Sequence, residues 1–236
     1  MSRKLTASLL ILTAVLANVG FSALGSIFNY PDGLDEPAGD VLALFRDNQG
    51  AVSAWFAVLA FSAALLIPIA IGVGRMSSAR AMRIAVPVGI AAGVVQVIGL
   101  LRWPILVPGF ASDAATSNPD IAGNARDSFS TVSDILGTAL GETLGYLLTA
   151  TWTVLVIVAL GRVFAGRWFQ VLGLASAALV FVGVFSPLGP EVFDTANFFG
   201  YVLYSLWLIS FAVVILVRER RQATARTATG QPKVAS

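Results

Sequence analysis

The sequence predicts an all-α polytopic membrane protein, a bundle of six transmembrane helices with an additional short helix in the second outer loop. Three observations lead to this prediction. Of the 236 residues, 57% are hydrophobic and 12% are charged, whereas soluble domains carry about 25% charged residues. The charges fall between six long uncharged runs. Basic and acidic residues are also divided unequally between the two sides that these runs separate.

Each uncharged run is long enough to cross a membrane, because about 20 mainly apolar residues span the hydrocarbon layer. The first run is too long for a signal-peptide core and lacks a clean cleavage site after it, so we expect it to be retained as a helix. The predicted six-span domain covers 1–221, and the tail 222–236 is predicted to be disordered because it lacks apolar periodicity. The expected spans are about 5–27, 51–74, 84–103, 142–163, 168–188 and 197–217.

The basic residues predict the orientation. Twelve of the fifteen lie on the face that carries both termini, with Glu219 as the single acid. The other twelve acids lie on the opposite face with Arg46 and Arg126. Since lysine and arginine are retained in the cytoplasm, both termini are expected to be cytoplasmic.

The two long outer loops contain helix signals. A Pro-Asp-Gly turn opens the first loop, and a short helix is expected at 40–47. In the second loop, Ser117 or Asn118 can cap a helix with Pro119 in its first turn. Apolar residues then recur at helical spacing, which is compatible with a helix lying at the interface or packed over the outer mouth; they are Phe129, Val132, Leu136 and Leu140.

Arg102 interrupts the third run near its outer end, about 27 Å along a helix that begins near residue 84. Two interpretations remain open. Arg102 snorkels to the interface beside an anchoring Trp103, or it turns inward to an acidic partner. Glu142, which opens the fourth span at a similar depth, is the best partner. The rival partners are Asp134, Glu191 and Asp194.

Two further groups of residues are candidates. Gly137, Gly141 and Gly145 recur every four residues around Glu142, a spacing that lets helix backbones approach closely. Five polar residues lie in or near the apolar runs, where they either line a polar cavity or form hydrogen bonds between helices. These five are Asn18, Asn29, Gln96, Tyr146 and Asn197.

Composition excludes several kinds of chemistry. Cysteine and histidine are both absent, which removes disulfides, thiolate metal sites, histidine-ligated haem and any thiol or imidazole mechanism. No catalytic residue, metal site or cofactor is predicted. The formal net charge of +2 is too small to indicate a nucleic-acid partner. The expected partners are the lipid bilayer and another membrane protein.

Several segments resemble one family of bacterial membrane proteins, catalogued as domain of unknown function 4386. The similar segments are "FNYPDGL", "LLRWPILVPGFA", "GETLGYLLTATWTVL" and "NFFGYVLYSLWLIS". The resemblance covers roughly residues 5–218 and implies a small multi-span protein of the bacterial inner membrane. It implies no activity.

Three functional classes therefore remain. We favour a non-enzymatic protein that acts as an accessory, sensory or assembly partner, because the cytoplasmic loops are short and catalytic motifs are absent. The alternative is a small-solute transporter or channel, although such sites usually use broken mid-membrane helices. An intramembrane enzyme is the second alternative, with Arg102 and Glu142 as its residues.

Overall fold

The computed structural model describes residues 1–228 and is helical over 89% of its length. Among these residues there is no strand. The fold class predicted from the sequence is therefore confirmed. Six helical segments are long and apolar enough to cross a membrane, namely Arg3–Phe28, Gln49–Gly74, Arg80–Asp113, Pro119–Ala165, Arg167–Leu188 and Val192–Thr224.

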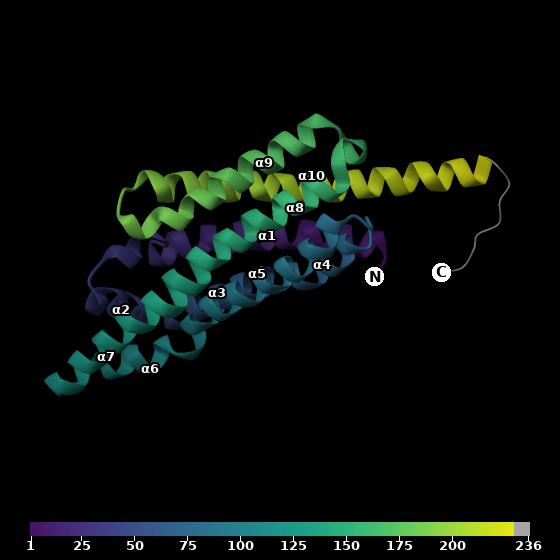
Figure 1. The fold of residues 1–236 in the computed structure, drawn as a ribbon. Helices are drawn as coiled ribbons and strands as arrows, with labels where there is room; N and C mark the ends of the chain where they lie inside the picture. The colour runs from purple at the N-terminus through teal and green to yellow at the C-terminus, as the bar shows by residue number, and fades with distance from the viewer. Residues whose placement is uncertain (229–236) are drawn as a thin grey trace.

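These spans form a ring in which each packs against its neighbours in the chain (Figure 1). The last span, in α10 (Val192–Ala228), returns to α1 (Arg3–Phe28) and closes the ring. The remaining spans are formed by α3 (Gln49–Ala64) with α4 (Leu66–Gly74), α5 (Arg80–Ile105) with α6 (Val107–Asp113), α8 (Gly145–Ala165), and α9 (Arg167–Val182) with η3 (Gly183–Leu188).

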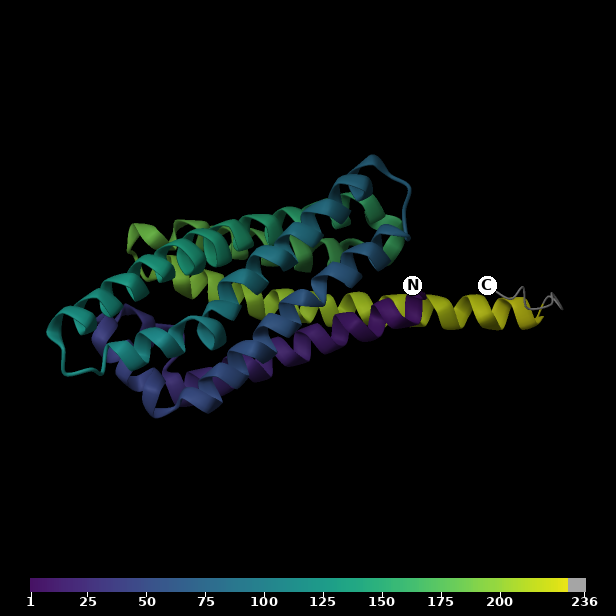
Figure 2. The same cartoon turned by 90° about the horizontal axis from the view of Figure 1, so that it is seen from below.

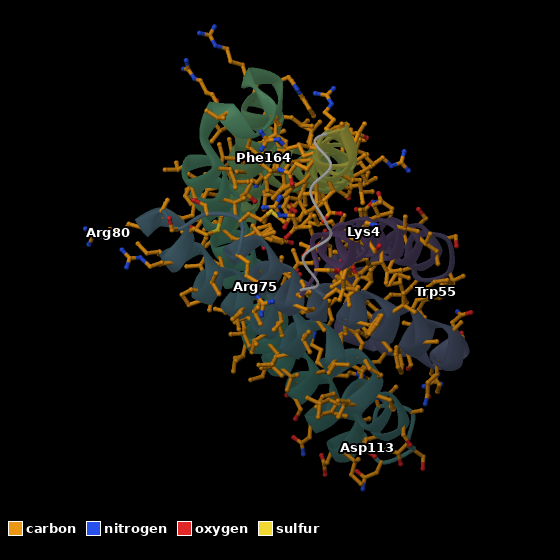
Figure 3. The ribbon with its side chains drawn as sticks, turned by 90° about the vertical axis from the view of Figure 1, so that its right-hand side faces the viewer. Lys4, Trp55, Arg75, Arg80, Asp113 and Phe164 are labelled. Atoms are coloured by element: carbon orange, nitrogen blue, oxygen red, sulfur yellow. The ribbon has the colours of Figure 1, made fainter. Side chains whose placement is uncertain are left out.

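The N-terminus and the end of α10 at Ala228 lie at the same end of the bundle (Figures 1 and 2). Figure 3 looks onto this end, where Lys4, Arg75 and Arg80 stand around the helix ends. We call it the basic end, and the opposite end, which carries most of the carboxylates, the acidic end. The described residues thus keep the separation of charge that the sequence predicted.

Prolines account for three interruptions in the spans. A proline lacks the N–H that would bond to the carbonyl four residues earlier. Pro68 corresponds to the break after Ala64, and Pro187 to the change from α9 to η3 at Gly183. Pro108 follows the break between α5 and α6 at Leu106. The spans remain continuous in direction but change their hydrogen-bond pattern at these points.

Three short helices form a head at the acidic end: α2 (Ala38–Asp47), α6 and α7 (Pro119–Val132). The helix predicted in the second outer loop begins at Pro119, as expected. Asn118 caps it, because its side-chain oxygen accepts hydrogen bonds from the backbone N–H groups of Asp120 and Ile121. The short helix expected at 40–47 is also present, within α2.

The helix α7 is not a separate interfacial helix. It continues through a π-helix, η2 (Ser133–Leu144), into α8, and the helical backbone runs from Pro119 to Leu160 before Gly161, with φ of 64°, interrupts it. At about 1.5 Å per residue, residues 119–160 extend about 63 Å, about twice the ~30 Å hydrocarbon thickness. The uncharged part, 143–161, suffices to span the membrane. Figure 1 shows the head at the end of the molecule that lies farthest from the N-terminus.

The tail also differs from the prediction. The helix α10 continues past Arg221 to Ala228 and extends beyond the bundle (Figure 1). Alanine has the highest helix propensity, and Ala223, Ala225 and Ala228 favour this continuation although the segment lacks an apolar face. The rest of the predicted disordered tail, 229–236, lies outside the described residues.

The buried apolar side chains form two clusters. The basic-half cluster fills the ring between α1, α4, α5, α8, α9 and α10, and the fully buried Trp152, Trp207, Phe169 and Phe211 form its centre. The acidic-end cluster lies beneath the head and contains Phe28, Phe45, Phe56, Trp103 and Phe129. The candidate site borders this second cluster.

Candidate functional site

Arg102 lies in the last turn of α5 and points into the bundle, with 7% of its surface exposed. Its Nη1 donates a hydrogen bond to the backbone oxygen of Gly99. The guanidinium carbon lies 5.3 Å from the centre of the Trp103 ring, within the range of a cation–π contact. Arg102 therefore does not snorkel into open solvent, and its charge is held among backbone and aromatic groups.

Glycines make room for this guanidinium. A Cβ atom at Gly137 would lie 2.6 Å from Nη2 of Arg102, so a side chain at this position would displace the arginine. Gly99 and Gly141 meet where α5 crosses η2, and a Cβ at Gly99 would lie 2.8 Å from the Cα of Gly141. Gly145 faces Gln96 on α5. The three glycines that recur every four residues all face α5.

Glu142 lies on η2 and is half-buried. Among the described residues it forms no direct ion pair with Arg102, whose side chain donates its hydrogen bond to Gly99. The Nε of Arg102 is buried and has no hydrogen-bond partner among those residues. The pairing of Arg102 with Glu142 thus stays a prediction about their electrostatic coupling.

Tyr30 lies within the electrostatic influence of both charges. It follows α1 in the loop to the head, outside the spans. Burial raises the pKa of Tyr30, the negative charge of Glu142 raises it further, and the positive charge of Arg102 lowers it. Both side chains therefore act on the same hydroxyl group. We call Tyr30, Arg102 and Glu142 the acidic-end polar site.

The π-helix η2 carries Glu142 and Gly137, the glycine that faces Arg102. Its wider turns are uncommon, usually occur as a single turn, and are frequent at functional sites. Here the π-helix covers 12 residues and carries Gly137, Gly141 and Glu142 on one segment against α5. A π-helix turns by a different angle per residue than an α-helix. The π-helix therefore determines which side of α8 lies in line with the face that contacts Arg102.

Trp103 is not an interfacial anchor, which corrects one interpretation of the sequence. Its exposed fraction is 1%, and its ring stacks on Phe56 with 4.7 Å between ring centres. It also meets Phe28 edge to face at 5.1 Å and Phe129 at 5.9 Å. These contacts join α1, α3, α5 and α7. Trp103 therefore ties the head to three of the spans.

Three of the five polar candidates form hydrogen bonds between helices. Asn18 of α1 donates to Ser205 of α10 at 2.9 Å. Gln96 of α5 donates to Thr149 of α8 at 2.9 Å. Asn197 of α10 donates to the backbone oxygen of Val180 in α9 at 3.0 Å. Each contact joins a different pair of neighbouring spans.

The other two polar candidates have different roles. Tyr146 packs edge to face against Tyr201, with 5.7 Å between ring centres. Asn29 is exposed and ends α1 in a left-handed conformation, with φ of 49°. Asparagine tolerates this conformation better than most residues. The five polar residues are therefore spread over several positions in the bundle and do not form one cluster.

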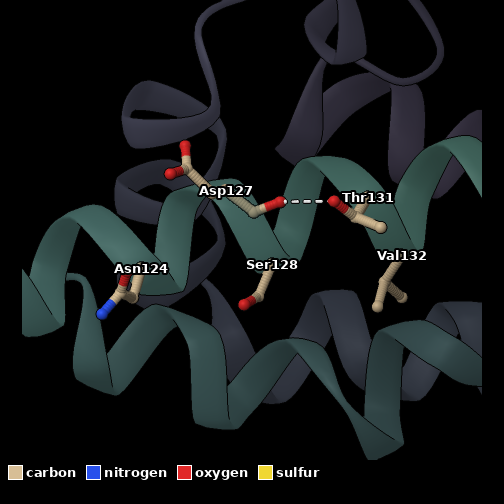
Figure 4. A pocket seen from close by; sticks show the side chains of 5 residues that line it. All are labelled: Asn124, Asp127, Ser128, Thr131 and Val132. Carbon is tan, nitrogen blue, oxygen red and sulfur yellow. Dashed lines mark hydrogen bonds between the residues drawn. The ribbon is translucent and has the colours of Figure 1, made fainter.

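The exposed side of α7 has its own shallow cavity of about 400 Å³ (Figure 4). The Thr131 hydroxyl donates to the backbone oxygen of Asp127 within the same helix. The other lining residues, Asn124, Ser128 and Val132, come from the same helix. This surface is one polar helix face, without a second element opposite it in the lining.

Sequence reasoning missed Tyr30 and the aromatic environment of Trp103. The only local feature of Tyr30 in the sequence is its position before Pro31. That position predicts a turn but does not indicate which side chains Tyr30 lies near. The helical spacing that includes Phe129 predicted a helix correctly. It did not reveal that Phe129 is buried against α5.

Comparison with known proteins gives a family and no activity. No curated protein and no solved structure matches the chain. A family model described as a domain of unknown function (DUF4386) matches residues 5–212, which cover all six spans in part or whole and the acidic-end polar site. The chain therefore belongs to the DUF4386 family of domains of unknown function, with the six-span helical architecture described above.

Proposed function

We propose that the protein is a non-enzymatic accessory or assembly protein of the bacterial inner membrane, with both termini in the cytoplasm. The basic end then faces the cytoplasm, as the positive-inside rule requires. The head projects from the opposite side of the membrane. Its role is to bind a partner protein there.

The observation that carries this proposal is the contrast between the closed middle of the bundle and the projecting head. Trp152 and Trp207 are fully buried at the centre of the ring, with 5.9 Å between ring centres. Transporter sites near the bilayer midplane are usually formed by interrupted helices with polar groups. Here large aromatic side chains occupy the middle, and the structure favours a binding role at the acidic end.

The head has a charge that selects a partner. Apart from the buried Arg102, the head and the segments that adjoin it between residues 32 and 134 contain nine acids and two arginines, Arg46 and Arg126, which gives a formal net charge of −7. The apolar Ile121 on α7 is 46% exposed beside these charges. A partner with a basic surface complements this arrangement, because opposite potentials steer association and select the correct partner.

Site-specific photocrosslinking in intact membranes tests the proposal. A photoreactive residue at position 121 is expected to give one discrete protein adduct, whereas the same residue at Val158, which is exposed on α8 in the span, should react with lipid. The adduct should disappear in an Asp127→Asn/Asp134→Asn variant. It should persist in a Glu191→Gln/Asp194→Asn variant, which removes two acids of the same end outside the head.

Two results would contradict the proposal. An adduct that survives neutralisation of Asp127 and Asp134 would show that the head charge does not select the partner. Solute flux by the purified protein in liposomes, with no adduct at position 121, would favour a transporter. The orientation is tested separately with reporter fusions after Arg221 and after Ser112, which should report opposite sides of the membrane.

A further inference from the structure

A second cavity lies at the basic end, far from the acidic-end polar site. Its volume is about 390 Å³, and it opens between the start of α1, the end of α8, the turn after α4 and residues 215–222 of α10. One part of its lining is apolar, from Met76, Phe164 and Ile215. The other part is basic, from Arg3, Arg218 and Arg221. We call this cavity the basic groove.

One of the three arginines is held in place without losing its charge. The Nη2 of Arg218 donates to the backbone oxygen of Val163 at 2.9 Å. The guanidinium carbon lies 5.1 Å from the centre of the Phe164 ring. Both contacts fix the direction of the side chain at the groove rim. Neither supplies a negative charge, so the guanidinium keeps its electrostatic capacity for an anion.

The groove has no acid in its lining to balance these arginines. Among residues 1–228, neither Arg3, Arg218 nor Arg221 forms an ion pair. Glu219 is the next residue after Arg218, but it does not line the groove. Three positive charges from two separate helices therefore converge on one cavity.

The position along the spans identifies the type of anion. Arg3 precedes the first uncharged run and Arg218 follows the last one, so both lie at the boundary of the hydrocarbon layer. Ile215 lies about one helical turn before Arg218 on α10, towards the membrane. An occupant must therefore carry negative charge at the arginines and apolar chains beside Ile215 and Phe164. A free phosphate satisfies only the first requirement.

We propose that the basic groove binds one anionic glycerophospholipid, with its phosphodiester headgroup among Arg3, Arg218 and Arg221 and its acyl chains along the apolar lining. Basic pockets between membrane helices on the cytoplasmic side are suited to such headgroups. The groove is separate from the head, and lipid binding there does not depend on the partner-binding role.

Native mass spectrometry of the delipidated, detergent-solubilised full chain tests this proposal. Phosphatidylglycerol should bind at least tenfold more tightly than phosphatidylcholine of the same acyl chains. An Arg3→Gln/Arg218→Gln/Arg221→Gln variant should lose this preference, since each basic residue near an anionic headgroup contributes about fivefold in binding. Inorganic phosphate at the same concentration as the lipid should not displace it.

A matched control keeps the total charge change equal. The Arg75→Gln/Arg80→Gln/Arg83→Gln variant removes three exposed arginines of the basic end that do not line the groove, and it should keep the lipid preference. If the triple variant of the groove does not fold, Arg3→Gln/Arg221→Gln retains the Arg218 contacts and should still weaken binding by about 25-fold, fivefold for each arginine.

The outcomes separate the possible ligands. Equal losses in the groove and control variants would overturn the proposal in favour of diffuse surface charge. Equal binding of phosphatidylglycerol and phosphatidylcholine would overturn it by showing that the headgroup is not recognised. Displacement by inorganic phosphate would show a free-anion site and would also overturn it.

Discussion

The two apolar clusters of this protein use similar side chains in different surroundings. The basic-half cluster, centred on Trp152 and Trp207, lies within the spans. The acidic-end cluster, centred on Trp103, lies next to Arg102 and extends under the projecting head. Of the two clusters, the second brings together the spans and the short helices of the head, because Phe45 and Phe129 come from α2 and α7.

The two clusters differ in the surroundings that their apolar side chains would contact on unfolding, lipid for the basic-half cluster and water for part of the acidic-end cluster. Lipid chains are as apolar as leucine, so helices inside the membrane associate mainly through close packing and hydrogen bonds. Apolar surface exposed to water has an additional unfavourable free energy of about 25 cal/mol per Å². The acidic-end cluster therefore gains stability from excluding water, whereas the basic-half cluster depends on the fit of its side chains.

The largest expected effect compares the two tryptophans. Trp103→Ala should lower the free energy of unfolding by about 3–5 kcal/mol, the usual range for deleting a buried tryptophan. Trp152 is equally buried. Trp152→Ala should nevertheless lower the free energy of unfolding less, because the cavity that it leaves is surrounded by helices packed within lipid. Denaturant titration in mixed micelles measures both, with the exposed Trp168→Ala as control. A larger loss for Trp152→Ala would contradict the comparison.

The next effect tests the space beside the buried cation. Gly137→Ala places a methyl group on the Arg102 guanidinium and should destabilise the protein by about 1–3 kcal/mol, as overpacking does. Gly123→Ala in α7 is the control, since nothing lies within 4 Å of its Cβ position. It should be neutral or stabilise by up to about 1 kcal/mol through helix propensity. Equal stability of the two variants would argue that the guanidinium moves freely.

The third effect asks whether Arg102 and Glu142 are coupled, although they form no direct ion pair. Arg102→Ala and Glu142→Ala should each lower thermal stability, and the double variant should lose less than their sum. The expected coupling is about 1 kcal/mol. The same cycle with the exposed Arg126→Ala in place of Arg102→Ala should be additive within about 0.5 kcal/mol. Additivity in both cycles would show that Arg102 and Glu142 are not coupled and that Arg102 is stabilised only by its contacts with Gly99 and Trp103.

The smallest effect concerns the start of the head helix. Asn118→Ala removes the oxygen that accepts from the N–H groups of Asp120 and Ile121 and should destabilise α7 by about 1 kcal/mol. Hydrogen exchange of these two amides should accelerate by about fivefold, a factor that follows from this free energy. Ser117→Ala should leave both rates unchanged. Unchanged exchange in Asn118→Ala would mean that contacts with α6 hold the first turn.

The spans and the start of α7 were predictable because they depend on local rules. Hydrocarbon thickness fixes the minimum length of an apolar run, and the Asn118–Pro119 pair is a local helix-start signal. The orientation of the Arg102 side chain could not be predicted from the sequence. Burial instead of snorkelling requires small residues at the facing positions of another helix. Gly137 is such a residue, and its place opposite Arg102 follows from packing.

Other features had no readable signal in the sequence. A π-helix uses the same residue types as an α-helix, so the helical spacing through Leu140 did not reveal that 133–144 is a π-helix joining α7 to α8. Trp103 lies at a span end, where tryptophans commonly anchor a protein at the interface. Its burial arises from Phe28, Phe56 and Phe129, which are distant in the sequence. Contacts of this kind appear only after the chain has folded.

The extension of α10 beyond the bundle has a practical consequence for imaging. A chain of 24.7 kDa buried largely in a detergent belt offers few features for particle alignment in electron microscopy. Because α10 runs without a break from the span to Ala228, a helical fiducial domain joined at that residue would continue the same helix. Its orientation would then be fixed relative to the six spans, and the number of residues at the junction would set its rotation by about 100° per residue.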